Sequence, residues 1–196
     1  MTQVFDTGDP YHSDEIARQL LSLHAESVRY LDEISVTEFF RPQALKWSPA
    51  EHVRHLHKSV RPLVKALAVP RIVLRLRFGR SRRRSRQFGD IRDRYRAKLA
   101  QGYGTNPYAP SARPVPRDAR AWRAEIMRTW TASVDALAAR VDLWRDGALD
   151  RYQLPHPLMG KLTVREMMFF TVYHNAHHVR LVAERRSPAH SSRVLT

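Results

Sequence analysis

The sequence predicts an all-α fold, a four-helix bundle, in a single domain that spans residues 1–196. Four segments carry apolar residues every three or four positions, and no alternation of period 2 competes with them. A chain of 196 residues is of ordinary size for one domain. Its content of 43% hydrophobic and 27% charged residues is normal for a globular protein, which argues against global disorder.

The first two helices are predicted over about 13–34 and 48–67. Ser13 is a favourable N-cap for the first helix, because acidic residues follow it in the first turn. The second helix opens with Ser48-Pro49-Ala50-Glu51, a capping box with proline at the first helical position. Pro70 is expected to kink or end it.

The third and fourth helices are predicted over about 117–144 and 163–186. The third has apolar residues at helical spacing: Trp122, Ile126, Trp130, Val134, Leu137 and Val141. The fourth begins at Thr163-Val-Arg-Glu166, a second capping box, and is expected to end at Ser187-Pro188.

A long connection, about 70–116, separates the second and third predicted helices. Part of it, near 91–99, could form a short extra helix. A connection of this length can return the chain to the end of the bundle that it left, so neighbouring helices can run parallel. The expected bundle therefore has a long crossover and differs from a simple up-down-up-down arrangement.

Positive charge is concentrated in this connection. The chain has a formal net charge of +15, and residues 71–98, with twelve Lys and Arg against Asp90 and Asp93, carry +10 of it. The densest stretch, Arg80 to Arg86, would attract the phosphates of nucleic acid or of an anionic lipid surface. It contains no aromatic residue for base stacking, and a solvated loop is the alternative interpretation.

The sequence lacks the features that mark several other classes of protein. Without cysteine, the chain has no disulfide scaffold, thiolate metal site or cysteine nucleophile. It has no His-Glu-x-x-His helix, no Gly-x-Ser-x-Gly elbow and no glycine-rich loop for nucleotides. Residues 1–10 do not resemble a signal peptide, and no apolar run approaches the ~20 residues of a transmembrane helix. We therefore expect a soluble, cytoplasmic protein.

Six of the ten histidines form two clusters in predicted helices: His52, His55 and His57, then His174, His177 and His178. Side chains four residues apart share a helix face, so His174 and His178 can direct two imidazoles at one ion. One histidine from a facing helix would complete the three ligands of a catalytic zinc-type site with an open position. Imidazoles suit zinc, nickel, copper or iron.

Spacing alone leaves the ligand set open. His177 competes with His178, and His52 with His55, because residues three apart also share a face. Histidines on a helix are also often surface residues or satisfied core residues. Three apolar residues, Met167, Phe170 and Leu181, are expected on the same face as His174 and His178, so this pair should point into the bundle.

Two stretches resemble the DinB-like superfamily, the damage-inducible four-helix metalloproteins. They are Trp47-Ser-Pro-Ala-Glu-His-Val-Arg-His55-Leu and the stretch from His156 to His178, which includes Thr163-Val-Arg-Glu166 and His174-Asn-Ala-His-His178. The resemblance implies an up-down-down-up bundle and assigns the three ligands to His55, His174 and His178. It also implies a divalent metal, commonly zinc or nickel, and often a homodimer.

The resemblance further implies a choice of activities. Members include thiol S-transferases that use low-molecular-weight thiols, a thiol-dependent isomerase and proteins described as metal-dependent hydrolases. We expect a hydrolase or a thiol S-transferase that acts on a small electrophilic substrate, with arginines of the long connection binding the carboxylates of a thiol. The alternative is a non-catalytic, metal-stabilised module whose Arg80 to Arg86 cluster contacts nucleic acid or an anionic surface.

No catalytic residue beyond the ligands can be assigned from the sequence. Tyr173 and His177 are nearest to the ligands along the chain, and either could instead pack or face solvent. Members often carry glutamine three residues after the last ligand, where this chain has Leu181. Any contact that this glutamine makes with substrate is therefore not expected here.

Overall fold

The structure, a computed structural model, describes residues 5–42, 46–103, 108–111 and 113–186. Four long helices make up most of it: α1 (Ser13–Asp32), α3 (Pro49–Ala68), α6 (Ala119–Asp142) and α8 (Val164–Arg186). The shorter helices are α2 (Val36–Phe40), α4 (Arg71–Phe78), α5 (Phe88–Ala100) and α7 (Asp146–Arg151). The protein is mostly helical, as predicted, but a small sheet of β1 (Gln153–His156) and β2 (Gly160–Thr163) was not expected.

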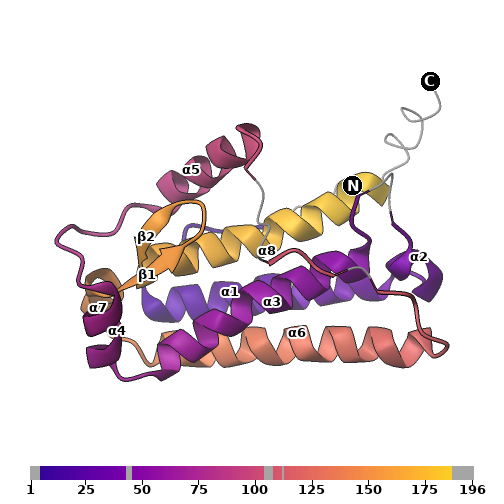
Figure 1. Ribbon diagram of the computed structural model, residues 1–196, viewed down its shortest axis with the longest axis horizontal. Helices are drawn as coiled ribbons and strands as arrows, with labels where there is room; N and C mark the ends of the chain where they lie inside the picture. Colours follow the sequence, from indigo (N-terminus) through magenta and orange to yellow (C-terminus); the bar gives the residue numbers. More distant parts are fainter. Residues whose placement is uncertain (1–4, 43–45, 104–107, 112, 187–196) are drawn as a thin grey trace.

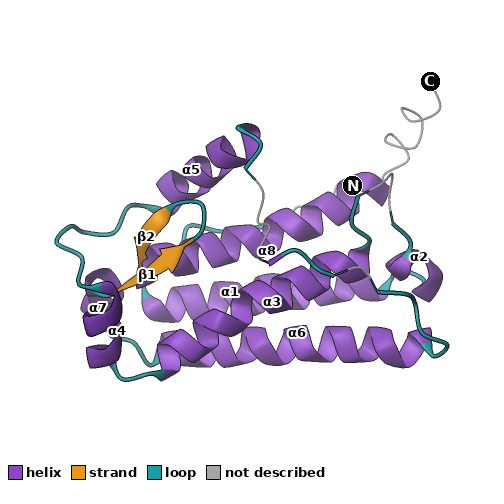
Figure 2. Ribbon diagram, viewed as in Figure 1, coloured by secondary structure: helices purple, strands orange, loops and turns teal. Residues whose placement is uncertain are grey.

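The four long helices lie side by side around one core (Figures 1 and 2). Helix α6 contacts both α1 and α3, and α8 contacts the same two helices. Trp130 of α6, Leu56 of α3 and Val172 of α8 are fully buried between them. The finer expectation of an up-down-down-up order stays a prediction.

The capping box at the start of α3 is confirmed. The Ser48 hydroxyl accepts a hydrogen bond from the Glu51 N–H at 3.3 Å, and the Glu51 carboxylate accepts from the Ser48 N–H at 2.8 Å. The helix ends at Ala68, before Pro70, as expected, although Pro62 lies inside it. This start fixes the register that places the histidines of α3.

The expected N-cap of α1 is wrong by one residue. His12 is the N-cap, and its N–H donates to the Glu15 carboxylate at 3.0 Å. Ser13 is already helical, and its N–H donates to Asp146 at 3.1 Å. The capping box is therefore formed by His12 and Glu15, and a residue from the start of α7 accepts from the Ser13 N–H. The expected end of α8 at Ser187-Pro188 lies outside the described residues.

The described part of the long connection contains two helices. The expected short helix near 91–99 is confirmed as α5, which packs on α8, with the Tyr95 ring centroid 5.0 Å from that of Phe170. Helix α4 was not predicted. It contacts β1, and together with α7 and the hairpin it lies at one end of the long helices (Figure 1).

The hairpin of β1 and β2 leads directly into α8. Gln153 pairs with Thr163 and His156 with Gly160, in an antiparallel register. The predicted capping box of α8 is confirmed, since the Glu166 N–H donates to the Thr163 hydroxyl at 3.1 Å and the Thr163 N–H to the Glu166 carboxylate at 3.0 Å. Strands of four residues are too short to show a period-2 pattern in the sequence.

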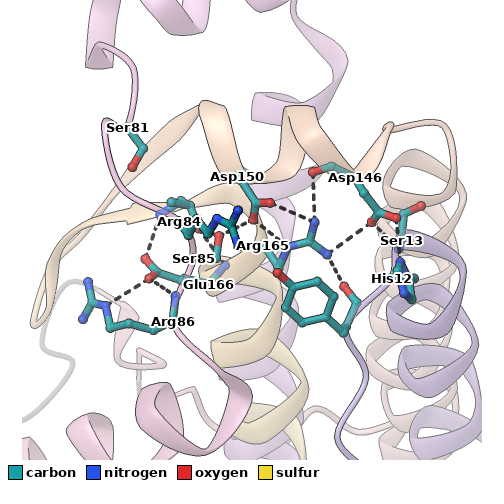
Figure 3. Close-up of polar contacts among 12 residues, drawn as sticks. His12, Ser13, Ser81, Arg84, Ser85, Arg86, Asp146, Asp150, Arg165 and Glu166 are labelled. Carbon is teal, nitrogen blue, oxygen red and sulfur yellow. Dashed lines mark hydrogen bonds and ion pairs between the residues drawn. The ribbon is translucent and has the colours of Figure 1, made fainter.

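The arginine-rich stretch is not uniformly free, because two of its members bind the start of α8. The Glu166 carboxylate is completely buried, and both Arg83 and Arg86 form ion pairs with it (Figure 3 shows the Arg86 contact). Arg165, also buried, pairs with Asp146 and Asp150 beside it. Part of the predicted cationic surface is therefore part of the fold.

Candidate metal centre

Three histidines meet between α3 and α8. His55 comes from α3, and His174 and His178 come from successive turns of α8. One nitrogen of each lies within 4.8 Å of the other two, and all three side chains are buried. The Nε2 atom of His174 is 3.0 Å from Nε2 of His55 and 3.1 Å from Nε2 of His178. These residues form a group that could hold a metal ion.

The proton positions indicate that a cation fits this group. The Nδ1 atom of His55 is 2.8 Å from the carbonyl oxygen of Tyr108, which can only accept, so His55 carries its proton on Nδ1 and a lone pair on Nε2. A neutral His174 has at most one hydrogen on Nε2, which cannot serve both of its short contacts. A shared cation would satisfy all three Nε2 atoms at once.

Burial keeps the three imidazoles neutral. It lowers the pKa of His55 below its usual range and lowers the pKa values of His174 and His178 well below theirs, and neighbouring histidines add to the effect in the last two. Metal ligands must be deprotonated, so these side chains are ready to coordinate an ion near neutral pH.

The two competing histidines have different places. His52 contacts His178, and their Nδ1 atoms are 2.8 Å apart. On its other ring nitrogen, Nε2, His52 accepts a hydrogen bond from Nη1 of Arg185 at 3.2 Å. His177 lines a separate cleft with Arg92, Arg96 and Arg180. His52 therefore contacts a member of the group without joining it, and His177 lies apart.

The remaining histidine of the first cluster turns away from the site. His57 Nδ1 lies 3.1 Å from the Ser133 hydroxyl of α6. Trp47 contacts the site directly, since its ring stacks on that of His178 with centroids 5.9 Å apart.

A cavity of about 220 Å³ opens beside His55 and His174. Its walls are mainly apolar and come from α3, α4, the hairpin and α8, with Leu63, Phe78, Leu154, Met167 and Phe170 among them. The expected apolar face of α8 is confirmed for Met167 and Phe170, but Leu181 lines the separate cleft of His177. Two of the three histidines, His55 and His174, thus adjoin a space for a small, largely apolar molecule.

A comparison with protein families settles the relationship that this geometry suggests. A family model described as the DinB superfamily matches residues 19–182. The chain belongs to the DinB superfamily. No curated protein and no solved structure matches it.

In this DinB-superfamily protein, the family match covers α3 and most of α8, and therefore includes all three histidines. Among the described residues, no helix is both long enough and apolar enough to cross a membrane.

The cavity wall of this DinB-superfamily chain includes polar residues that the sequence reasoning did not select, and one of them is a histidine. His156, the last residue of β1, is buried in the cavity wall, and its ring centroid is 4.3 Å from that of Phe170. Its Nδ1 accepts hydrogen bonds from the N–H groups of Leu158 at 3.1 Å and Met159 at 3.2 Å. The proton must therefore be on Nε2.

Burial lowers the pKa of His156 to about 4, so the ring is neutral at pH 7 and Nε2 is a hydrogen-bond donor. No acceptor from the part of the chain described pairs with this Nε2. Sequence reasoning missed the residue because it lies in a hairpin, far along the chain from both histidine clusters. By contrast, Tyr173 and His177, the nearest residues along the chain, are absent from the cavity wall.

Proposed function

We propose that this protein binds one divalent metal ion, zinc or nickel, through His55, His174 and His178 and acts as a metal-dependent enzyme on a small electrophilic substrate. The observation that carries the proposal is the convergence of three neutral imidazoles, two of which, His55 and His174, line an apolar cavity. Three imidazoles leave an open position on such an ion, as catalytic sites do and closed structural sites do not.

When bound, the ion supplies Lewis acidity and lowers the pKa of a water or thiol ligand, which suits either hydrolysis or thiol transfer. Residues of the cavity wall bind and orient the substrate. Phe170 and Met167 exclude water and hold the apolar part of a substrate. The Nε2–H of His156 donates to an acceptor oxygen of that substrate.

The two activities make different demands on the residues near the cavity. A thiol S-transferase needs a site for a low-molecular-weight thiol, whose carboxylates arginines would bind. Among the described residues, no arginine or lysine lines the cavity, whereas Arg92 and Arg96 of α5 line the separate cleft of His177. Hydrolysis needs no second substrate, so the cavity by itself supports it more directly.

The deciding experiment measures metal before activity. We expect elemental analysis of purified protein loaded with zinc or nickel to give one ion per chain, and His174→Ala to lose it. His57→Ala is the matched control, because His57 lies on the same helix as His55 but bonds to α6. A wild-type chain that retains no ion would exclude the proposed site.

Activity is then tested on the loaded protein with an activated ester and with an aryl chloride plus several small thiols. Turnover that follows metal content supports an enzyme. Metal binding without turnover on any of these substrates favours the alternative, a non-catalytic module whose Arg80 to Arg86 cluster contacts nucleic acid or an anionic surface. Light scattering of the same sample tests the homodimer that the family resemblance implies.

A further inference from the structure

Helix α4 turns an apolar face outward. Ile72, Val73 and Leu76 follow the spacing i, i+1 and i+4, which places them on one side of the helix, and Val69 lies just before it. The side chains of Ile72, Val73 and Leu76 are 53%, 43% and 79% exposed, and that of Val69 is 36% exposed. The helix is anchored from its other side, where Leu74 is buried at 2% exposure. An apolar stripe so exposed indicates a binding surface.

Positive charge that forms no ion pair among the described residues lies next to this stripe, on α4 itself and on the loop that follows it. Arg75 of α4, Arg80 and Arg82 of the following loop, and Arg151 of α7 line one open cleft with Gly79 and Ser81. All four arginines are exposed, none forms an ion pair within the described ranges, and no acidic residue lines the cleft. The surface therefore combines apolar side chains with a ready site for anions.

We propose that this surface docks peripherally on an anionic phospholipid bilayer. Ile72, Val73 and Leu76 enter the boundary between headgroups and acyl chains, while Arg75, Arg80, Arg82 and Arg151 bind lipid phosphates. A helix with an apolar face and basic flanks lies in this way in the plane of a membrane interface. Each basic side chain near an anionic surface contributes about 1 kcal/mol of attraction.

The chemistry of the surface favours lipid over other occupants. A second copy of this chain would bring the same arginines against one another, and like charges repel. A nucleic acid would pair with the arginines but leave Leu76, at 79% exposed, without an apolar partner. A bilayer satisfies both parts of the surface. The helix is also preformed, since Lys161 Nζ donates to the Phe78 carbonyl at its end, so little ordering is needed on binding.

The test is co-sedimentation of the full chain with two kinds of vesicle, pure phosphatidylcholine and phosphatidylcholine mixed with phosphatidylglycerol. We expect binding only to the mixed vesicles, weakening as salt is raised. The variant Ile72→Gln with Leu76→Gln keeps the net charge and the exposed helix, and we expect about tenfold weaker binding. Leu143→Gln, which alters a leucine 72% exposed elsewhere, is the matched control.

The charge component is tested with Arg75→Ser against Arg120→Ser, an exposed arginine of α6. Only the first should weaken vesicle binding, and circular dichroism checks that every variant is folded. Three results would overturn the proposal: no binding to the mixed vesicles, binding that the glutamine variant leaves unchanged, or a lipid-free dimer that this variant dissociates. Equal binding to a DNA duplex that survives the glutamine variant would instead assign the arginines to nucleic acid.

Discussion

The guanidinium of Arg83 contacts both carboxylate oxygens of Glu166, at nitrogen–oxygen distances of 2.5 and 2.8 Å. The backbone N–H of Arg86 donates a further hydrogen bond to the Glu166 carboxylate at 2.9 Å. Burial raises the pKa of the Glu166 carboxyl, but the hydrogen bonds from Arg83 and its neighbours outweigh this and hold it below its usual range. The pair ties the arginine-rich loop to the first turn of α8, from which His174 and His178 follow.

Replacing Arg83 should therefore lower the free energy of unfolding, whereas replacing the adjacent Arg82 or Arg84 should not. Removing one partner of a buried pair typically costs 3–5 kcal/mol, and because Arg83 is itself 42% exposed we expect about 1–3 kcal/mol for Arg83→Met. Arg82→Met and Arg84→Met change exposed side chains and should stay within about 0.5 kcal/mol. Urea unfolding of the three variants measures this, and equal losses would mean that the ion pair has no special role.

Arg185 should weaken metal binding at the three histidines. Arginine can only donate, so its contact with Nε2 of His52 leaves the His52 proton on Nδ1, directed at Nδ1 of His178. This places the His178 proton on Nε2, so an ion can bind all three Nε2 atoms only if it displaces this proton and the contact with His52 changes. The positive charge of Arg185 also repels an incoming cation.

We expect Arg185→Met to raise zinc affinity about fivefold to tenfold, which corresponds to about 1–1.4 kcal/mol. Arg120→Met, which removes the same charge at an exposed position on α6, should change it little. Competition with a colorimetric chelator gives both affinities. Unchanged or weaker binding in Arg185→Met would show that this contact does not oppose the metal.

His156→Asn should impair ligand binding without loss of metal. The Asn carbonyl oxygen can still accept from the N–H groups of Leu158 and Met159, so the hairpin keeps its turn, but the Nε2–H donor is removed. One hydrogen bond is worth about 1 kcal/mol, so we expect roughly fivefold weaker binding of an oxygen-bearing inhibitor such as acetohydroxamate.

The measurement uses protein loaded with cobalt, whose visible spectrum reports the ligand. Phe170→Leu, which trims the neighbouring wall but keeps the donor, is the control. If the asparagine variant bound the inhibitor as tightly as wild type, His156 would be only a structural residue of the hairpin.

Stability should fall in mild acid partly because of His24. Its ring lies against Trp130 with centroids 4.3 Å apart, and burial lowers its pKa from 6.5 to about 4. Between these values the unfolded chain binds the proton and the folded chain does not, so stability is complete above pH 6.5 and decreases as the pH falls toward 4. We expect His24 to contribute about 2 kcal/mol of the loss between pH 7.5 and 5.

His24→Gln keeps a polar group near Thr131, the hydrogen-bond partner of His24, but does not titrate. Its free energy of unfolding should therefore depend less steeply on pH over this interval than that of wild type. Parallel urea titrations at several pH values provide the comparison. Identical pH profiles for the two proteins would show that the ring is already solvated in the folded state.

The sequence by itself determined the long helices and the pairing of two histidines. The Ser48 and Thr163 capping boxes and the helical spacing depend on contacts within a few residues, so they are readable from the chain. The spacing of His174 and His178 places them on one helix face by geometry alone. The hairpin strands were missed because they are short and carry no such local pattern, and α4 was missed because its eight residues are too few for a helical period to stand out in the sequence.

Helical spacing left open which histidine of α3 joins that pair; the family resemblance assigned His55, and the tertiary structure gives the physical reason. His52 and His55 differ by about 60° around the helix, so the rotation of α3 against α8 makes the choice, and this rotation is set by packing between the helices. Packing likewise binds Arg83 to Glu166 and leaves Leu76 facing outward. These outcomes depend on contacts between residues far apart in the chain, which no local pattern records.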